Sequence, residues 1–266
     1  MNTIIHPIDK STDKIRIFID GQLPLAHAVT RKLIENHGVS SENLIVNTYH
    51  RLDNAPYADW LKQQNITYLT ETYKDNIVFD ILSDFKPDYI ISAYGLRILP
   101  KKILNLARVL AFNLHPSYLP DYKGRWIPSW IIINGETEYG ITIHIMDEGI
   151  DTGPILFQKK LPIALDDTAY SLYNKIVCNF ITVFDSFFQD LVNGRIVSRP
   201  MPPGGRYFGK SMPYDGVIDP AWSIEKIERF IRSMVYPPHR GAVYQTKNGV
   251  FECLNLQDYL KVSTQI

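Results

Sequence analysis

The chain has 266 residues, of which 45% are hydrophobic and 21% are charged, and its 28 Lys and Arg balance its 28 Asp and Glu. This composition is typical of a globular protein and predicts one large domain, or one domain with a small appendage. A balanced charge without a basic stripe argues against a general nucleic-acid binder, and the absence of a run of ~18 apolar residues argues against a membrane span.

The polar first residues do not form a signal peptide. The two cysteines, Cys178 and Cys253, are too few and too far apart in sequence for a disulfide framework. Both features indicate a reducing compartment. We therefore expect a cytoplasmic protein with neither a nucleic-acid nor a membrane partner.

The first half of the chain alternates short apolar runs with amphipathic segments. Apolar runs of this kind predict buried parallel strands, and apolar residues at helical spacing between them predict helices. Residues 1–13 precede the pattern and are expected to be a poorly ordered lead-in. The rhythm predicts an α/β fold with a doubly wound, mostly parallel sheet that binds ligands at the carboxyl ends of its strands. The predicted strands are 15–19, 44–46, 66–69, 89–92 and 109–112, and the predicted helices begin near residues 25, 59 and 75.

The second half contains a strictly alternating strand, Ile141–Met146, and a long segment, 167–193, whose apolar residues recur at helical spacing. A Pro- and Gly-rich stretch, 199–213, predicts a linker. Beyond it, a helix over 224–234 and a hairpin turning at 247–249 predict a short C-terminal extension. The predicted domains are a lead-in at 1–13, a main domain at 14–200 and an extension at 201–266.

Polar side chains follow the strand that ends at Phe112. Asn113 and His115 are two residues apart, so both side chains leave an extended chain on one face. Pro116 directly after them prevents both further strand pairing and an immediate helix. The amide can hold a developing oxyanion, and the imidazole can move a proton.

A carboxylate follows the alternating strand. Asp151 lies between Gly149 and Gly153, which let the backbone bend around it. Near an imidazole, this carboxylate can fix the tautomer of the ring. An amide, an imidazole and a carboxylate at strand ends are the groups that acyl chemistry on an amine requires.

Other interpretations of these residues are weaker. A lone histidine is more often a satisfied buried residue, and Asp151 alone would be an ordinary turn carboxylate. Ser117 near His115 could indicate a serine hydrolase, but the chain has no Gly-x-Ser-x-Gly motif of the kind that carries the nucleophile in such enzymes. No second histidine at a ligand spacing and no thiolate cluster accompanies His115, so no metal is predicted. His144 is interpreted as a structural or rim residue.

The motif Asn-x-His-Pro-Ser-x-Leu-Pro at 113–120, followed by Gly-x-Asp-x-Gly at 149–153, resembles the 10-formyltetrahydrofolate-dependent formyltransferase family. The resemblance covers roughly residues 14–200 and implies that this main domain is catalytic. It implies 10-formyltetrahydrofolate as cosubstrate and a catalytic trio of Asn113, His115 and Asp151.

The loop from Ser92 to Pro100 resembles the pterin-binding segment of that family. Backbone N–H and C=O groups in an apolar turn suit the edge of a flat heterocycle. The alternative is a plain strand-to-helix connection that packs through Leu96 and Leu99. The resemblance implies cosubstrate contacts from Leu96, Arg97, Ile98, Leu99, Asp147 and Gly149.

Within the family, the chain is most similar to enzymes that formylate a dTDP-, GDP- or UDP-linked amino sugar for bacterial surface polysaccharides such as O-antigen and lipopolysaccharide. Its tail does not resemble the large C-terminal barrel of methionyl-tRNA formyltransferases. The turn after its first strand does not match the Gly-rich phosphate loop of the purine-pathway member, and the regulatory domain of the deformylases is not expected. The resemblance also implies a homodimer.

The acceptor site is predicted from chemistry. A pyrophosphate needs cationic or N–H donors, and a base needs an aromatic surface. Each candidate is, taken singly, more often a solvated charge or a packing residue. A methionyl-tRNA formyltransferase-like enzyme, a formyltetrahydrofolate hydrolase and a silent folate-binding protein remain alternatives. The predicted acceptor contacts are Gln22, Lys74, Arg125, Lys210 and Trp222.

Overall fold

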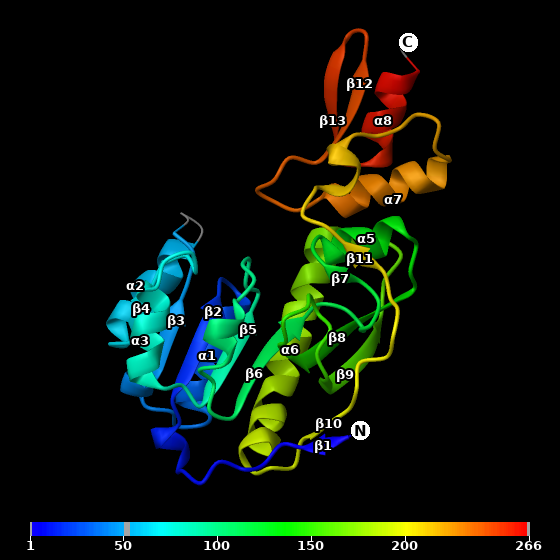
Figure 1. The fold of residues 1–266 in the computed structure, drawn as a ribbon. Coiled ribbons are helices and arrows are strands. Elements are labelled where there is room, and N and C mark those ends of the chain that lie inside the picture. The colour runs from blue at the N-terminus through cyan, green and yellow to red at the C-terminus, as the bar shows by residue number, and fades with distance from the viewer. Residues whose placement is uncertain (1, 51–53, 265–266) are drawn as a thin grey trace. The chain divides into compact units, whose positions relative to one another are not determined.

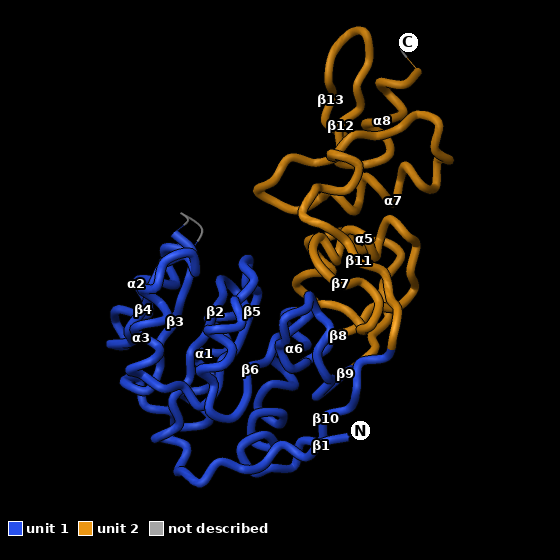
Figure 2. The backbone as a smooth tube through the Cα atoms, in the orientation of Figure 1, with its two compact units in different colours: residues 1–115, 142–158, 177–202 blue, residues 116–141, 159–176, 203–266 orange. Residues whose placement is uncertain are grey.

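A computed structural model describes residues 2–50 and 54–264, which form two compact units (Figure 2). Unit 1 contains residues 1–115, 142–158 and 177–202, and unit 2 contains residues 116–141, 159–176 and 203–266. The helices are α1 (Leu25–Glu35), α2 (Ala55–Gln63), α3 (Ile77–Phe85), α4 (Lys101–Leu104), α5 (Ile127–Ile133), α6 (Ala169–Val192), α7 (Ile224–Met234) and α8 (Leu256–Ser263). The strands are β1 (Thr3–Ile4), β2 (Ile17–Gly21), β3 (Leu44–Asn47), β4 (Thr67–Leu69), β5 (Tyr89–Ala93), β6 (Leu110–His115), β7 (Lys123–Gly124), β8 (Glu138–Ile145), β9 (Ile155–Pro162), β10 (Val197–Ser198), β11 (Tyr207–Phe208), β12 (Ala242–Thr246) and β13 (Gly249–Cys253).

The largest sheet has seven strands in the order β4-β3-β2-β5-β6-β8-β9 (Figure 1). Strands β2 to β6 pair in parallel, and β8 pairs antiparallel with β6. The chain winds outwards from β2 to β4 and then returns to β5 on the other side of β2. The winding direction therefore switches between β2 and β5, the position at which open α/β sheets bind ligands. The predicted class, a doubly wound and mostly parallel α/β sheet, is confirmed.

The two faces of this sheet pack against different helices in unit 1. On one face, Phe112 and Tyr89 contact Phe187 and Phe188 of α6, with ring centroids 5.5 and 6.1 Å apart. The other face carries an apolar row with one residue from each of four neighbouring strands, which forms a core cluster with α3 and α4. That row consists of Ile45, Phe18, Ile90 and Ala111.

A polar row lies two residues further along the same strands, and therefore on the same face as the apolar row. Its members are direct neighbours across β3, β2, β5, β6 and β8, and most are buried. Four parallel strands thus carry polar side chains near their carboxyl ends, on one side of the sheet. The row consists of Asn47, Asp20, Ser92, Asn113 and His144.

Unit 2 contains residues 203–266, which are nearly all of the predicted C-terminal extension. The hairpin β12–β13 and the helices α7 and α8 share a core cluster with the end of α5, and Arg229 Nε donates to the carbonyl of Ile133 over 3.2 Å. The predicted helix and hairpin are confirmed. The predicted boundaries at residues 13 and 200 stay predictions, since the compact units divide the chain at other points.

Several elements differ from the sequence prediction. α5 was not predicted, and its Pro128 occupies the first turn of the helix, where proline is tolerated. α8 was not predicted although Asn255 and Asp258 form a capping box at its start. The expected N-cap of α3 was Asp75, whereas the structure places Asn76 there. Part of the lead-in is ordered by pairing, because β1 pairs with β10.

Among the residues that the structure describes, no helix is both long enough and apolar enough to span a membrane.

Candidate functional site

The structure brings together the three side chains predicted to be catalytic, all of them in unit 1. His115 Nδ1 lies 3.4 Å from Asp151 Oδ1, and Asn113 Nδ2 donates to the same carboxylate oxygen over 3.4 Å. β6 supplies the amide and the imidazole, and the loop after β8 supplies the carboxylate. The side chains of His115 and Asp151 are only 3% and 11% exposed. An imidazole and a carboxylate thus meet away from bulk water.

The loop that carries Asp151 depends on close backbone approach. A Cβ on Gly153 would lie 2.0 Å from the carbonyl oxygen of Ile145, and one on Gly149 would lie 2.0 Å from Thr152 Oγ1. Asp147 Oδ1 accepts hydrogen bonds from Gly149 N at 3.0 Å and from Thr152 Oγ1 at 2.7 Å. The left-handed backbone, with φ of 54°, falls on Asp151 itself. The glycines therefore provide space, and the aspartate makes the turn.

His144 is part of the same cluster and is buried, so it is not a rim residue, and the interpretation of it as a structural residue stays a prediction. Its Nε2 lies 3.2 Å from Asn113 Nδ2 and 3.5 Å from Asp151 Oδ1, and the residue is 2% exposed. The cause is the antiparallel pairing of β6 with β8, which puts His144 directly opposite Asn113. Directly opposite residues project from the same face of a sheet.

The hydrogen bonds of His144 orient the Asn113 amide. His144 Nδ1 lies 2.8 Å from the carbonyl oxygen of Ile145, which can only accept, so Nδ1 carries the proton. In the neutral ring Nε2 is then an acceptor. Two acceptors face the amide of Asn113: His144 Nε2 and the carboxylate of Asp151. Only the amide nitrogen can donate to them, so it lies on their side. The amide therefore presents its N–H groups to the cluster.

Asp151 is ionised. Burial alone would raise its pKa, but attraction to His115 and hydrogen bonding with His115 outweigh burial and hold the pKa of Asp151 well below its ordinary range. A permanent negative charge therefore faces both imidazoles.

His115, His144 and Asp151 also form a possible ligand set, with one ligand atom from each within 4.8 Å of the others. Two imidazoles and a carboxylate are suitable ligands for zinc and similar ions. The sequence prediction of no metal depended on the absence of a second histidine near His115, and the structure places one there. The absence of a metal stays a prediction.

The predicted cosubstrate residues occupy two loops of unit 1. Ile98 is exposed, whereas Leu99 is buried in the core cluster with α3 and α4, as in the packing alternative. The guanidinium of Arg97 lies over the ring of Tyr49 and donates to the carbonyl of Glu71. The backbone N–H groups of Leu96 and Arg97 both donate to the hydroxyl of Tyr49.

Asp147 and Gly149 line a cavity of about 390 Å³ between α4 and the loop after β8. An ion pair between Lys101 and Glu148 links the two sides. The other residues that line it are Leu104, Asn105 and Met146.

The predicted acceptor residues are divided between the two units. In unit 1, Gln22 is buried and accepts from Asn54 at 3.4 Å, whereas Lys74 is exposed. In unit 2, the carbonyl of Lys210 accepts from the indole of Trp126 at 2.9 Å, and the backbone N–H of Arg125 donates to the carbonyl of Phe208 at 2.9 Å. Trp222 packs against the core cluster of the extension. Their contact with a nucleotide sugar stays a prediction.

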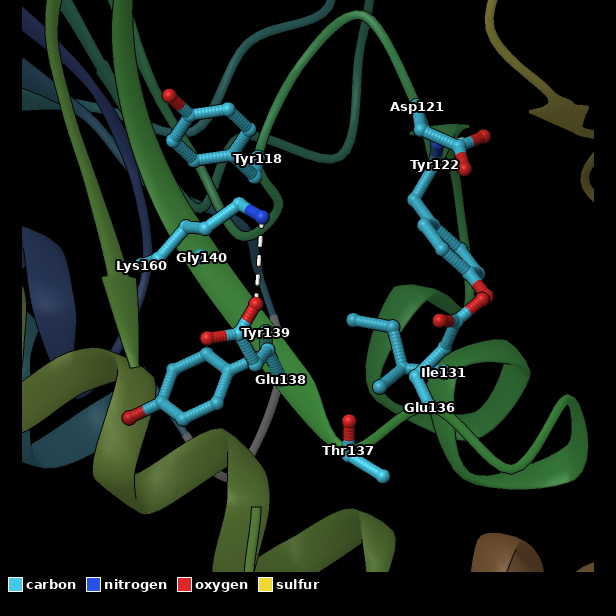
Figure 3. Close-up of a pocket in the computed structure, with 10 residues that line it drawn as sticks. All are labelled: Tyr118, Asp121, Tyr122, Ile131, Glu136, Thr137, Glu138, Tyr139, Gly140 and Lys160. Carbon is cyan, nitrogen blue, oxygen red and sulfur yellow. Dashed lines mark hydrogen bonds and ion pairs between the residues drawn. The ribbon is translucent and has the colours of Figure 1, made fainter. Parts of the chain in front are cut away.

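A second cavity, of about 230 Å³, lies within unit 2 (Figure 3). Figure 3 shows Tyr118, Lys160, Glu138 and Tyr139 along one wall and Asp121 and Glu136 on the other, with Lys160 paired to Glu138. Asp121 and Glu136 are likewise paired, with Arg206. Its acidic groups are therefore matched by cations of the protein, and the residues that line it are not among those predicted for the site.

Comparison with known proteins identifies one family of similar enzymes. Residues 13–179 match the family described as formyl transferase. The GDP-perosamine N-formyltransferases of Brucella melitensis and Brucella abortus are each 34% identical to this chain over 253 residues, which is 92% of this chain and 94% of theirs.

Solved structures share the fold. A sugar 3N-formyl transferase, crystallised in the presence of dTDP and 5-N-formyl-THF, aligns with a TM-score of 0.74 and 22% identity, over 91% of this chain and 85% of that one. An N-formyltransferase from Helicobacter canadensis, in complex with folinic acid and dTDP-3-aminofucose, aligns with a TM-score of 0.72 and 21% identity, over 91% and 87%.

The family match covers more than half of the chain and includes every residue of the cluster around Asp151. The Brucella relatives extend the similarity over almost the whole length of both chains. The resemblance found in the two sequence motifs is thereby confirmed. The chain belongs to the formyl transferase family and is an enzyme that transfers a formyl group.

Proposed function

We propose that the protein transfers a formyl group from 10-formyltetrahydrofolate to the amino group of a nucleotide-linked amino sugar. The observation that carries this proposal is the 34% identity to GDP-perosamine N-formyltransferases over 92% of the chain. The ligands of the two solved structures, a formylated folate with dTDP or with dTDP-3-aminofucose, support the same substrate classes.

The reaction forms a bond between the sugar nitrogen and the formyl carbon and breaks the bond between that carbon and N10 of the folate. The uncharged amine attacks, and the carbonyl oxygen becomes an oxyanion. One of the two Asn113 N–H groups, which face Asp151 and His144 in the structure, turns to that oxyanion and donates to it, with help from His115. A donor aimed at a developing oxyanion stabilises the transition state by ~3 kcal/mol.

His115 moves the proton. Its Nδ1 lies 3.4 Å from the ionised Asp151, which favours the tautomer with the proton on Nδ1. Nε2 is then the basic nitrogen, and it takes the proton that the amine loses and returns it to N10 as the bond to carbon breaks. The negative charge of Asp151 stabilises the imidazolium that forms between these two steps.

The proposed site uses the other predicted contacts as well. Leu96, Arg97, Ile98, Leu99, Asp147 and Gly149 would contact the folate, and Gln22, Lys74, Arg125, Lys210 and Trp222 the nucleotide sugar. We also propose that the enzyme works in the cytoplasm, as a homodimer and without a metal, in the biosynthesis of a surface polysaccharide such as O-antigen.

The test is a formylation assay with 10-formyltetrahydrofolate and a panel of nucleotide-linked amino sugars, beginning with GDP-perosamine and dTDP-3-aminofucose. We expect one of them to gain one formyl group by mass spectrometry. Release of formate without an acceptor would favour the hydrolase, and formylation of methionyl-tRNA alone would favour the tRNA enzyme. Either result would contradict the proposal.

A further inference from the structure

Asp20, near the end of β2, is fully buried, and no step of the proposed reaction uses it. Its Oδ1 accepts from the hydroxyl of Tyr73 at 2.5 Å and from Asn47 Nδ2 at 3.3 Å. Its Oδ2 accepts from the hydroxyl of Tyr49 at 3.0 Å. A buried carboxyl group is costly unless its oxygens are hydrogen-bonded. Three neutral side chains from the ends or connections of neighbouring strands supply these bonds.

Tyr49 connects this carboxyl group to the loop that follows β5. Its hydroxyl donates to Asp20 and accepts from the backbone N–H groups of Leu96 at 2.6 Å and of Arg97 at 3.2 Å. A phenol has one proton to donate and lone pairs that accept, so these bonds use both functions of the hydroxyl. The guanidinium of Arg97 lies 4.6 Å from the centroid of the Tyr49 ring. One side chain therefore holds two consecutive peptide groups of the loop.

The same loop touches Asp20 directly. A Cβ on Gly95 would lie 2.6 Å from Asp20 Oδ2 and 3.0 Å from Ser92 Oγ. The backbone at Gly95 therefore packs against the carboxyl group, in space that no side chain can share. Hydrogen bonding from Leu96 and Arg97 and contact at Gly95 are independent observations, and both connect Asp20 to residues 95–97.

This arrangement lies at the switch point of the sheet. β2 and β5 are neighbours at that point, and Asp20 stands directly opposite Ser92. Crevices at the carboxyl ends of such strands are the usual ligand sites of open α/β sheets. The loop held by Tyr49 begins directly after β5 and contains four of the residues proposed to contact the folate.

We propose that Asp20 and Tyr49 are positioning residues for the cosubstrate, because they hold the backbone of residues 95–97 in the conformation that binds the reduced folate. The inference rests on the proposed function, which assigns the folate to this loop. A loop that is ordered before binding loses less conformational entropy when the ligand binds. Loss of the hydrogen bonds and contacts that order it therefore weakens cosubstrate binding. We expect a loss of about tenfold, as for one or two hydrogen bonds.

Tyr49→Phe removes the hydroxyl and keeps the ring. The matched control is Tyr57→Phe, which removes another buried tyrosine hydroxyl of unit 1, bonded to Thr30 Oγ1 at 2.7 Å and away from the loop. Gly95→Ala is a second variant, since its methyl group would displace the loop from Asp20 while Tyr49 stays intact.

Three measurements follow on each folded variant: hydrogen exchange of the Leu96 and Arg97 amides, calorimetric titration with folinic acid, and steady-state kinetics. For Tyr49→Phe and Gly95→Ala we expect faster exchange at both amides, about tenfold weaker binding of folinic acid and a matching rise in KM for 10-formyltetrahydrofolate. The value of kcat and the KM for the amino sugar should stay within about twofold. Tyr57→Phe should change none of these.

The outcomes separate the two proposals. If the wild-type enzyme binds no folinic acid, the proposed cosubstrate and this inference are both wrong. If the wild type binds it and Tyr49→Phe binds it equally well, only the positioning role is wrong, whatever the exchange rates. A fall in kcat with an unchanged KM for the folate would also contradict the positioning role.

Discussion

Two buried carboxyl groups of unit 1 differ in how they ionise. Burial raises the pKa of Asp20 from 3.8 to about 6, because hydrogen bonds from Tyr73, Tyr49 and Asn47 and attraction to Arg97 offset burial only in part. Burial also acts on Asp151, but there attraction to His115 and hydrogen bonding with it outweigh burial, and the pKa falls well below the ordinary range. The two groups occupy the same edge of one sheet.

The charge of a buried acid is therefore decided by its partners as well as by its depth. Asp151 faces His115 and keeps a negative charge that can support the imidazolium that His115 becomes in the proposed reaction. Asp20 faces mainly neutral hydroxyl and amide groups and serves as a hydrogen-bond acceptor that can be protonated slightly below neutrality. One group therefore suits catalysis, and the other suits holding the chain in place.

Removing the charge at Asp151 should have the largest effect. Asp151→Asn keeps the size of the side chain but no longer stabilises a charged His115 or selects its tautomer. We expect kcat to fall on the order of a thousandfold in a variant that still folds, although its melting temperature also falls because the ionised carboxylate stabilises the fold at neutral pH. The measurement is steady-state kinetics with the amino-sugar acceptor beside a thermal melt. A loss below fivefold would show that this carboxylate is not needed.

Replacing Asp20 should change how stability depends on pH. Because the folded pKa of Asp20, about 6, lies above its unfolded value, the protonated group stabilises the fold at low pH, and this contribution is lost as the pH rises through 6. The difference between the folded and the unfolded pKa of Asp20 corresponds to about 3 kcal/mol of unfolding free energy. Between pH ~4 and pH ~7, wild type should therefore lose up to about 3 kcal/mol of unfolding free energy that Asp20→Asn does not lose. Urea unfolding over this range tests it, and a difference between the proteins that does not vary with pH would contradict it.

Removing His144 should have a smaller effect than removing Asp151, because His144 orients Asn113 and does not transfer the proton of the reaction. His144→Leu takes away the acceptor 3.2 Å from Asn113 Nδ2. We expect kcat to fall about 10- to 100-fold, with KM for the folate nearly unchanged. Single-turnover rates would measure this effect directly. Unchanged rates would return His144 to the structural role that its sequence context suggested.

Removing metal should have the smallest effect. Although His115, His144 and Asp151 could coordinate an ion, the proposed reaction needs His115 as a base, and a bound metal would occupy it. Dialysis against a strong chelator should leave activity within about twofold, and added zinc should inhibit. Loss of activity on chelation that is restored by one metal would make this cluster a metal site.

Part of this site could be predicted from the sequence. The period of two along a strand predicted that Asn113 and His115 share a face, and two glycines marked the turn at Asp151. His144 was missed because its place depends on which strand pairs with β6 and in which register, and neither strand encodes that alone. The pairing is a property of the tertiary structure.

Asp20 was missed for a related reason. In the sequence it opens a turn, Asp20–Pro24, and turns are a usual place for aspartate. Only the parallel pairing of β2 with β3 and β5 shows that it lies in a row with Asn47 and Ser92. In each of these strands an apolar run is followed by one polar residue. This pattern is visible in the sequence, and the pairing of the strands aligns the polar residues in one row.

The most direct test compares wild type with His115→Asn in formyl transfer from 10-formyltetrahydrofolate to GDP-perosamine and dTDP-3-aminofucose, with product identified by mass. Wild type should formylate one of these amines, and the variant should be folded yet slower by a thousandfold or more. A variant that works at a near-normal rate, or a wild type that formylates no amino sugar, would contradict the central claim that this buried imidazole moves the proton of an amino-sugar formylation.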